Sequence, residues 1–167
     1  MQSIGGYRGT IFVAFAAALL LAGPAASAGA EGEVTRAEYK AAVEPICKSN
    51  TKANDRILKG VRGKVQRGKL KAASRQFARA SRALKKTLRQ LRAVEQPVAD
   101  VRTLGKWLRY VKLQADLLRK VAQKLSAGNR VATQSLVARL TRNANLANNT
   151  VFAFSFVDCR FRPSRYQ

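Results

Sequence analysis

The sequence predicts an all-α protein, an antiparallel up-down-up-down four-helix bundle over residues 35–159 that is closed by one disulfide. Two observations predict this fold. Apolar residues recur at helical spacing in four successive segments separated by short breaks. The two cysteines, Cys47 and Cys159, stand near opposite ends of these segments. An up-down-up-down topology returns the end of the fourth helix to the level where the first begins, so it brings the cysteines together.

The first 28 residues have the layout of a cleavable secretory signal peptide. Arg8 precedes an unbroken apolar run over residues 10–22, and a Gly-Pro pair and the A-x-A-like site at residues 26–28 follow. A run of that length makes only about 20 Å of helix, which is short of the ~30 Å hydrocarbon core of a bilayer. We expect cleavage after Ala28 and a secreted or extracytoplasmic protein. The alternative is an uncleaved N-terminal membrane anchor.

The first predicted helix follows a flexible mature N-terminus at residues 29–34. It begins at a capping box, in which Thr35 and Glu38 each satisfy a backbone N–H of the first turn. It continues to about Val61, with Pro45 either kinking it or restarting it. Three glycines then mark a loose basic connection, at Gly60, Gly63 and Gly68.

Residues 69–94 and 98–126 predict the second and third helices, separated at Pro97. Each carries an apolar stripe with alternating spacings of three and four residues. The stripe of the second helix consists of Leu70, Ala73, Phe77, Ala80, Leu84, Thr87 and Leu91. The third helix has a second apolar line that widens its buried arc, made of Trp107, Tyr110, Leu117 and Val121.

The fourth predicted helix spans residues 130–155 and starts after Gly128, a plausible stop for the preceding helix. Its end is ambiguous, because residues 152–156 alternate as a strand would. We expect helix there, since a lone strand would have no partner. Asn143 falls on the inward stripe, where one buried amide can fix the register of a bundle. A basic C-terminal tail follows at residues 160–167.

The cysteine pair favours a structural disulfide, because an even number of cysteines in an exported chain is typical of one. The alternatives are a metal-binding pair and a reactive thiol. Neither has supporting partners, since the chain contains no histidine and no further cysteine.

The charge of the chain is strongly one-sided. There are 32 basic and 9 acidic residues, a formal net charge of +23, and no acidic residue stands between Asp55 and Glu95. Six basic residues of the second helix lie opposite its apolar stripe; this basic stripe consists of Lys71, Arg75, Arg79, Arg82, Lys86 and Arg89. The connection before it adds Arg62, Lys64 and Arg67. Like charges at these spacings are locally unfavourable and indicate an anionic partner; the alternative is a solvated helix face.

We expect a non-enzymatic protein whose partner is an anionic cell-envelope polymer or an anionic membrane surface. Nucleic acid is less favoured, because the chain is exported and the basic run lacks interleaved aromatic residues. The nine carboxylates are scattered and histidine is absent. No catalytic residue, metal site, cofactor or small-molecule substrate is therefore predicted. The alternative function is a protein-interaction or chaperone-like module, if the line through Tyr110, Leu117 and Val121 is exposed.

Two short motifs carry a resemblance to a known group of proteins. They are Glu44-Pro45-Ile46-Cys47-Lys48-Ser49-Asn50 and Asp158-Cys159. With these motifs the chain resembles a family of exported helical proteins of actinobacteria, over its whole mature length. The resemblance implies a helical bundle with paired cysteines and no known activity. The chain has no lipid-accepting cysteine after the apolar run, so the resemblance does not imply a lipid anchor.

Overall fold

The computed structural model describes residues 33–162, and over that range the protein contains helices and no strand. The predicted signal peptide and most of both predicted flexible termini lie outside the described residues. The helices are α1 (Arg36–Leu58), α2 (Val61–Gln66), α3 (Leu70–Arg92), α4 (Val101–Ser126) and α5 (Arg130–Thr150), with single 3-10 turns η1 (Val98–Asp100) and η2 (Phe152–Phe154).

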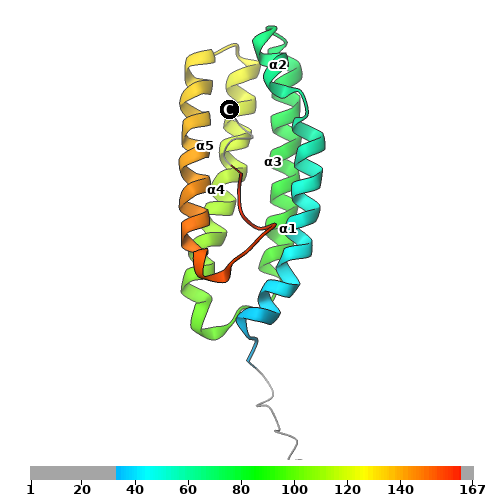
Figure 1. The fold of residues 1–167 in the computed structure, drawn as a ribbon. Coiled ribbons are helices and arrows are strands. Elements are labelled where there is room, and N and C mark those ends of the chain that lie inside the picture. The colour runs from blue at the N-terminus through cyan, green and yellow to red at the C-terminus, as the bar shows by residue number, and fades with distance from the viewer. Residues whose placement is uncertain (1–32, 163–167) are drawn as a thin grey trace, which may run out of the picture. The chain divides into compact units, whose positions relative to one another are not determined.

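Four long helices pack around one core, which confirms the predicted fold class at that level. The extensive contacts join α3 to α4, α4 to α5 and α1 to α3, and the short α2 packs on α3. Figure 1 shows the four long helices lying alongside one another, with α2 at one end. The central pair, α3 and α4, therefore carries the outer helices, α1 on one side and α5 on the other.

The start of α1 is the predicted capping box. The Thr35 hydroxyl accepts a hydrogen bond from the Glu38 backbone N–H at 3.2 Å, and the Glu38 carboxylate accepts one from the Thr35 N–H at 2.8 Å. The helix continues through the exposed Pro45 without interruption, so the alternative of a restart at this residue is wrong. It ends at Leu58, because Gly60 has a φ of 69°, a left-handed conformation that glycine adopts readily.

The predicted loose connection is in part a helix. Val61–Gln66 forms α2 between two glycines of positive φ, Gly60 and Gly68. The reason is burial: Val61 is part of the core and Val65 packs against it. Six residues do not make a stable helix by propensity alone, so packing on α3 is what orders this segment.

The predicted end of the fourth helix is wrong by several residues. The helix ends at Thr150, one 3-10 turn follows, and Ser155 has a φ of 49°. This turn buries both Phe154 and Phe156 while Phe152 stays 78% exposed. The alternation that resembles a strand therefore reflects a change of direction, because the chain leaves α5 here and crosses to α1 (Figure 1).

The segment after this turn, residues 155–161, is held against α1 and α5 by side chains; we name it the C-terminal strap. The Glu44 carboxylate of α1 accepts hydrogen bonds from the backbone N–H groups of Val157 and Asp158. Asn148 of α5 forms a reciprocal pair with the Phe161 backbone, donating to its carbonyl at 2.9 Å and accepting from its N–H at 2.8 Å. The strap therefore connects two helices that pack on different members of the central pair.

The strap is also covalently attached. Cys47 and Cys159 form the predicted disulfide, with Cα atoms 4.9 Å apart and a sequence separation of 112 residues. Both cysteines are buried. The chain-entropy model gives about 4–5 kcal/mol of stabilisation for a loop of this length, from the restricted unfolded chain.

Four aromatic rings pack where the strap begins. Phe154 contacts Tyr39 edge-on at 6.3 Å between ring centroids, and Phe156 lies 5.3 Å from Phe154 and 5.5 Å from Trp107. Burial raises the pKa of the Tyr39 hydroxyl to about 12. These rings join α1, α4 and the strap into the same core.

A pair of amides lies within the packed interface of α4 and α5, as predicted for Asn143. Asn143 donates to the Gln114 side-chain carbonyl at 2.6 Å and to the Tyr110 backbone carbonyl at 3.0 Å. Both side chains are at least 96% buried. The Gln114 Nε2 and the Asn143 Oδ1 have no hydrogen-bond partner among the described residues. Each amide therefore has one hydrogen-bonding atom without a partner. Replacing only one of the two residues would leave the other amide buried with still fewer hydrogen bonds, which is energetically costly.

This pair predicts a non-additive response to mutation. Asn143→Leu leaves the Gln114 amide buried without a partner and should cost about 1–3 kcal/mol of unfolding free energy. Gln114→Leu combined with Asn143→Leu removes both amides and should recover most of that loss. Urea unfolding of both single variants and the double variant measures the coupling. Additive losses would contradict the pairing.

Candidate functional site

The basic stripe lies on one face of α3, and all six of its residues are exposed. Its position follows from the apolar pattern, since Ala73, Phe77, Ala80 and Leu84 of the same helix are buried against the core. No member of the stripe forms an ion pair with any carboxylate in the described range 33–162. The stripe is therefore a surface of uncompensated positive charge.

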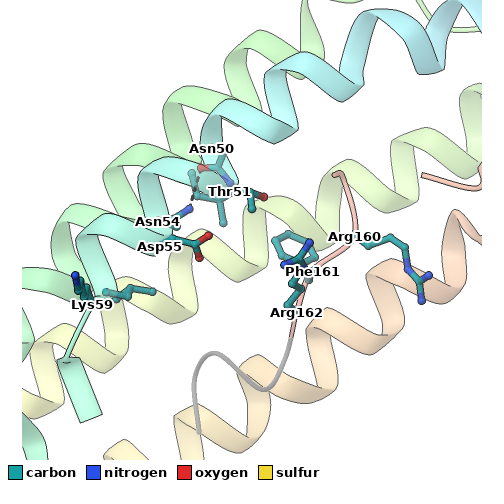
Figure 2. A pocket seen from close by; sticks show the side chains of 10 residues that line it. Asn50, Thr51, Asn54, Asp55, Lys59, Arg160, Phe161 and Arg162 are labelled. Atoms are coloured by element: carbon teal, nitrogen blue, oxygen red, sulfur yellow. Dashed lines mark hydrogen bonds between the residues drawn. The ribbon is translucent and has the colours of Figure 1, made fainter. Parts of the chain in front are cut away.

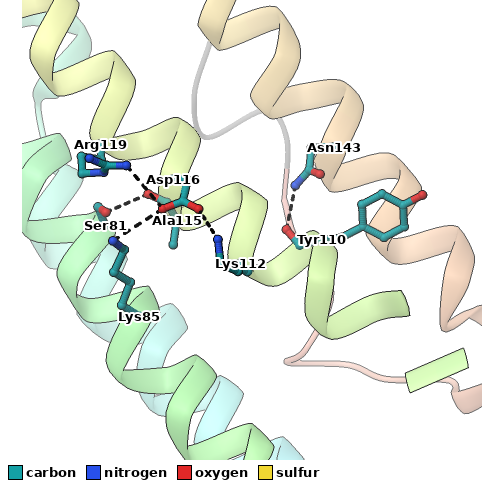
Figure 3. A network of polar contacts seen from close by, with 8 residues as sticks. All are labelled: Ser81, Lys85, Tyr110, Lys112, Ala115, Asp116, Arg119 and Asn143. Carbon is teal, nitrogen blue, oxygen red and sulfur yellow. Dashed lines mark hydrogen bonds and ion pairs between the residues drawn. The ribbon is translucent and has the colours of Figure 1, made fainter. Parts of the chain in front are cut away.

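Lys85, a neighbour of the stripe on α3, does form an ion pair with a carboxylate. Asp116 of α4 lies 3.5 Å from Lys85 of α3, 2.9 Å from Lys112 and 3.8 Å from Arg119 (Figure 3). The hydrogen bond from Lys112 holds the pKa of the Asp116 carboxyl below its usual range, although partial burial opposes this. One carboxylate thus offsets part of the positive charge of three basic residues between α3 and α4.

The Asp100 carboxylate has a similar structural role at the start of α4. Arg36 donates to both of its oxygens, at 2.6 and 2.7 Å. This bidentate pair ties the first turn of α1 to the start of α4. The hydrogen bonds from Arg36 hold the pKa of Asp100 below its usual value.

The three predicted basic residues before α3 have different environments. Arg62 and Arg67 are exposed, but Lys64 is half-buried and its ammonium group donates to the Gln76 side chain at 2.9 Å. Gln76 in turn donates to the backbone carbonyls of Ile57 and Lys59, at the end of α1. Lys64 therefore contributes to the junction of α1, α2 and α3.

An apolar groove opens beside α2, and the sequence analysis did not anticipate it. Its volume is about 570 Å³. Val61 and Val65 of α2 form one wall, and Phe77 and Leu125 contribute from α3 and α4. Residues of α5 form the opposite wall, namely Thr133, Gln134, Val137, Ala138 and Thr141, and Arg62 and Gln66 add polar groups on the α2 side.

The groove arises from the way the outer elements pack. The short α2 packs on α3, whereas α5 packs on α4, so the two elements flank a space above the central pair. No element of the described chain fills this space. The sequence signal for it was weak, because its lining comes from four separate segments and α2 was expected to be a loop.

A second, smaller pocket of about 210 Å³ lies between α1 and the C-terminal strap (Figure 2). Asn50, Thr51, Asn54 and Asp55 of α1 line one side of it. Arg160, Phe161 and Arg162 line the other side. Asn54 donates to the Asn50 side chain at 2.9 Å, so these two amides bind each other. The lining combines charged groups of both signs with apolar side chains, among them Leu58 and Leu84.

The apolar line that the sequence analysis left open is largely covered. Trp107, Leu117 and Val121 are at least 98% buried, and Tyr110 is half-buried against the core. Elsewhere, Val131 of α5 is exposed, and the exposed side chains of Phe152 and Val157 line one further pocket at the end of α5.

Within residues 33–162, no group of three or more histidine, cysteine, aspartate or glutamate side chains is arranged to hold a metal ion. None of the helices in this range is both long enough and apolar enough to cross a membrane.

The chain matches no protein-family model, no curated protein and no solved structure.

Proposed function

We propose that the protein is a non-enzymatic, exported module that binds anionic surfaces of the cell envelope, polymer or lipid, through the basic stripe of α3. The observation that carries this proposal is that the six stripe residues are exposed and unpaired within the described chain. Charges of both signs are usually interspersed on the surface of a folded protein. The exposed face of α3 carries basic residues and no acidic one.

The energetic cost of the stripe supports a binding role. Neighbouring members stand three or four residues apart, and each like-charge pair at such spacing destabilises a helix by a few tenths of a kcal/mol. An anionic surface removes that repulsion on binding. Each basic residue near an anionic membrane contributes about 1 kcal/mol to association, so six suffice for reversible binding at low ionic strength.

Export is part of the same proposal. It rests on the layout of residues 1–28 and on the buried disulfide, which oxidising compartments favour. It also agrees with the resemblance of the two cysteine motifs to exported helical proteins of actinobacteria. Outside the cytoplasm, anionic polymers and lipid head groups are more accessible partners for the stripe than nucleic acid.

We further infer the up-down-up-down topology of the four helices. Two hydrogen bonds support an antiparallel arrangement of α3 and α4, because a later residue of α3 bonds to an earlier residue of α4. Ser74 donates to the Ala122 carbonyl and Ser81 donates to the Ala115 carbonyl, each at 2.7 Å. This order also accounts for the meeting of Cys47 and Cys159.

The alternative, a chaperone-like module that uses an apolar helix face, finds less support. It requires an exposed contiguous patch, and the line proposed for it is largely buried.

The stripe predicts a loss of binding when its charge is removed. In Arg75→Gln/Arg79→Gln/Arg82→Gln, we expect about a hundredfold weaker partitioning onto phosphatidylglycerol vesicles at low salt, from about 1 kcal/mol per residue. The same variant should be released from wall polymer at lower salt than the unmodified protein. Its stability should be unchanged or slightly higher. Co-sedimentation over a salt series measures the effect.

A matched control exists on α4. Arg102, Lys106 and Arg109 are exposed and have the same spacing as the three substituted arginines. Changing these three to glutamine removes the same charge from the protein and should weaken binding much less. Equal loss in the two triple variants would show a general charge effect and contradict a site on α3. Equal recovery of the unmodified protein on neutral and anionic vesicles would contradict the whole proposal.

Export predicts a defined mature N-terminus. Protein expressed with its own N-terminal segment in an exporting bacterial host should begin at Gly29 when it is recovered from the extracytoplasmic fraction. Intact mass measurement under non-reducing conditions tests this and the disulfide together. Protein that retains Met1 in the membrane fraction would support the anchor instead.

A further inference from the structure

The groove between α2 and α5 has the composition of a small-molecule site. Its volume, about 570 Å³, falls within the range of roughly 300–1,000 Å³ that such sites occupy. Apolar side chains dominate its floor and walls, with Phe77 and Leu125 buried beneath and Val137 at the side. It follows α5 from Thr133 to Thr141, about 12 Å of helix. This shape suits one extended apolar chain.

The charge around the groove restricts what that chain can carry. All the lining residues fall within two stretches of sequence that lack aspartate and glutamate, residues 56–94 and 117–157. Arg62 lines the groove itself, the Arg67 guanidinium lies beside Gly63 of α2, and the Arg130 guanidinium lies near Gly68. The positive charge around the groove would repel a cationic ligand. A neutral ligand would form no ion pair with Arg62, whereas an anionic ligand would.

We propose that this groove binds a single-chain fatty acid, with its acyl chain between α2 and α5 and its carboxylate held by Arg62. The proposal deepens the proposed binding of anionic partners but uses a different surface, since no residue of the basic stripe lines the groove.

The test is isothermal titration of the purified protein with octanoate, decanoate and laurate below their micellar concentrations. We expect one site per chain, with affinity rising by up to about fourfold for each added methylene until the groove is filled. Dodecyltrimethylammonium has a similar chain and the opposite charge, and it should bind at least tenfold more weakly than laurate.

Two substitutions place the ligand. Ala138 is exposed on α5 and lines the groove, so Ala138→Trp fills the space without altering the core and should abolish laurate binding. Ala41→Trp, at an exposed position on α1, is the matched control and should bind normally. Arg62→Gln should weaken laurate binding about fivefold and leave the weaker binding of neutral dodecanol unchanged. Circular dichroism and urea unfolding establish that each variant is folded.

Several outcomes would overturn the proposal. Laurate binding that survives Ala138→Trp would place the ligand elsewhere. Equal affinity for laurate and dodecyltrimethylammonium would show nonspecific apolar adsorption. An unmodified protein that is dimeric, ignores laurate and becomes monomeric in Ala138→Trp would assign the groove to a second copy of the chain.

The variants separate this inference from the proposed function. Arg75→Gln/Arg79→Gln/Arg82→Gln should lose vesicle binding and keep laurate binding, whereas Ala138→Trp should show the reverse. If stripe binding fails while laurate binding holds, the proposed surface is wrong and the groove proposal stands. If laurate binding fails while vesicle binding holds, the groove proposal alone is wrong.

Discussion

The disulfide between Cys47 and Cys159 attaches the C-terminal strap to α1, on the side of the bundle where α1 and α5 are joined by the strap. The outer helices α1 and α5 pack chiefly on different members of the central pair, α3 and α4. The C-terminal strap spans the distance between them, anchored on α1 by the disulfide and Glu44 and on α5 by Asn148. Phe156 of the strap packs against Phe154 and Trp107. One covalent constraint therefore holds both outer helices.

Opposite ends of the bundle are consequently built in different ways. The strap end is tied by a covalent bond, packed rings and the bidentate pair of Arg36 with Asp100. At the α2 end the short helix packs on α3, and an apolar groove lies between α2 and α5. The uncompensated positive charge of α3 connects the two ends along one outer face.

The spacing of apolar residues and the number of cysteines correctly predicted several features of the fold. The capping box at Thr35, the buried and exposed faces of α3, the burial of Asn143 and the disulfide all followed from spacing or residue type. Features that depend on distant contacts were missed. The six residues of α2 are ordered by packing of Val61 and Val65, which a short sequence flanked by glycines does not reveal. Likewise, Phe154 and Phe156 are both buried because Ser155 turns the chain toward α1, which neither helical nor strand periodicity describes.

Hydrogen–deuterium exchange before and after reduction of the disulfide tests most directly whether the strap holds the outer helices. Reduction should accelerate exchange in the middle of α1 and in the last two turns of α5, because both lose their common anchor. The amides of α3 and α4 that face each other should keep most of their protection, since that interface does not depend on the strap. Unchanged exchange in α1 and α5, or equal acceleration in all four helices, would contradict this account.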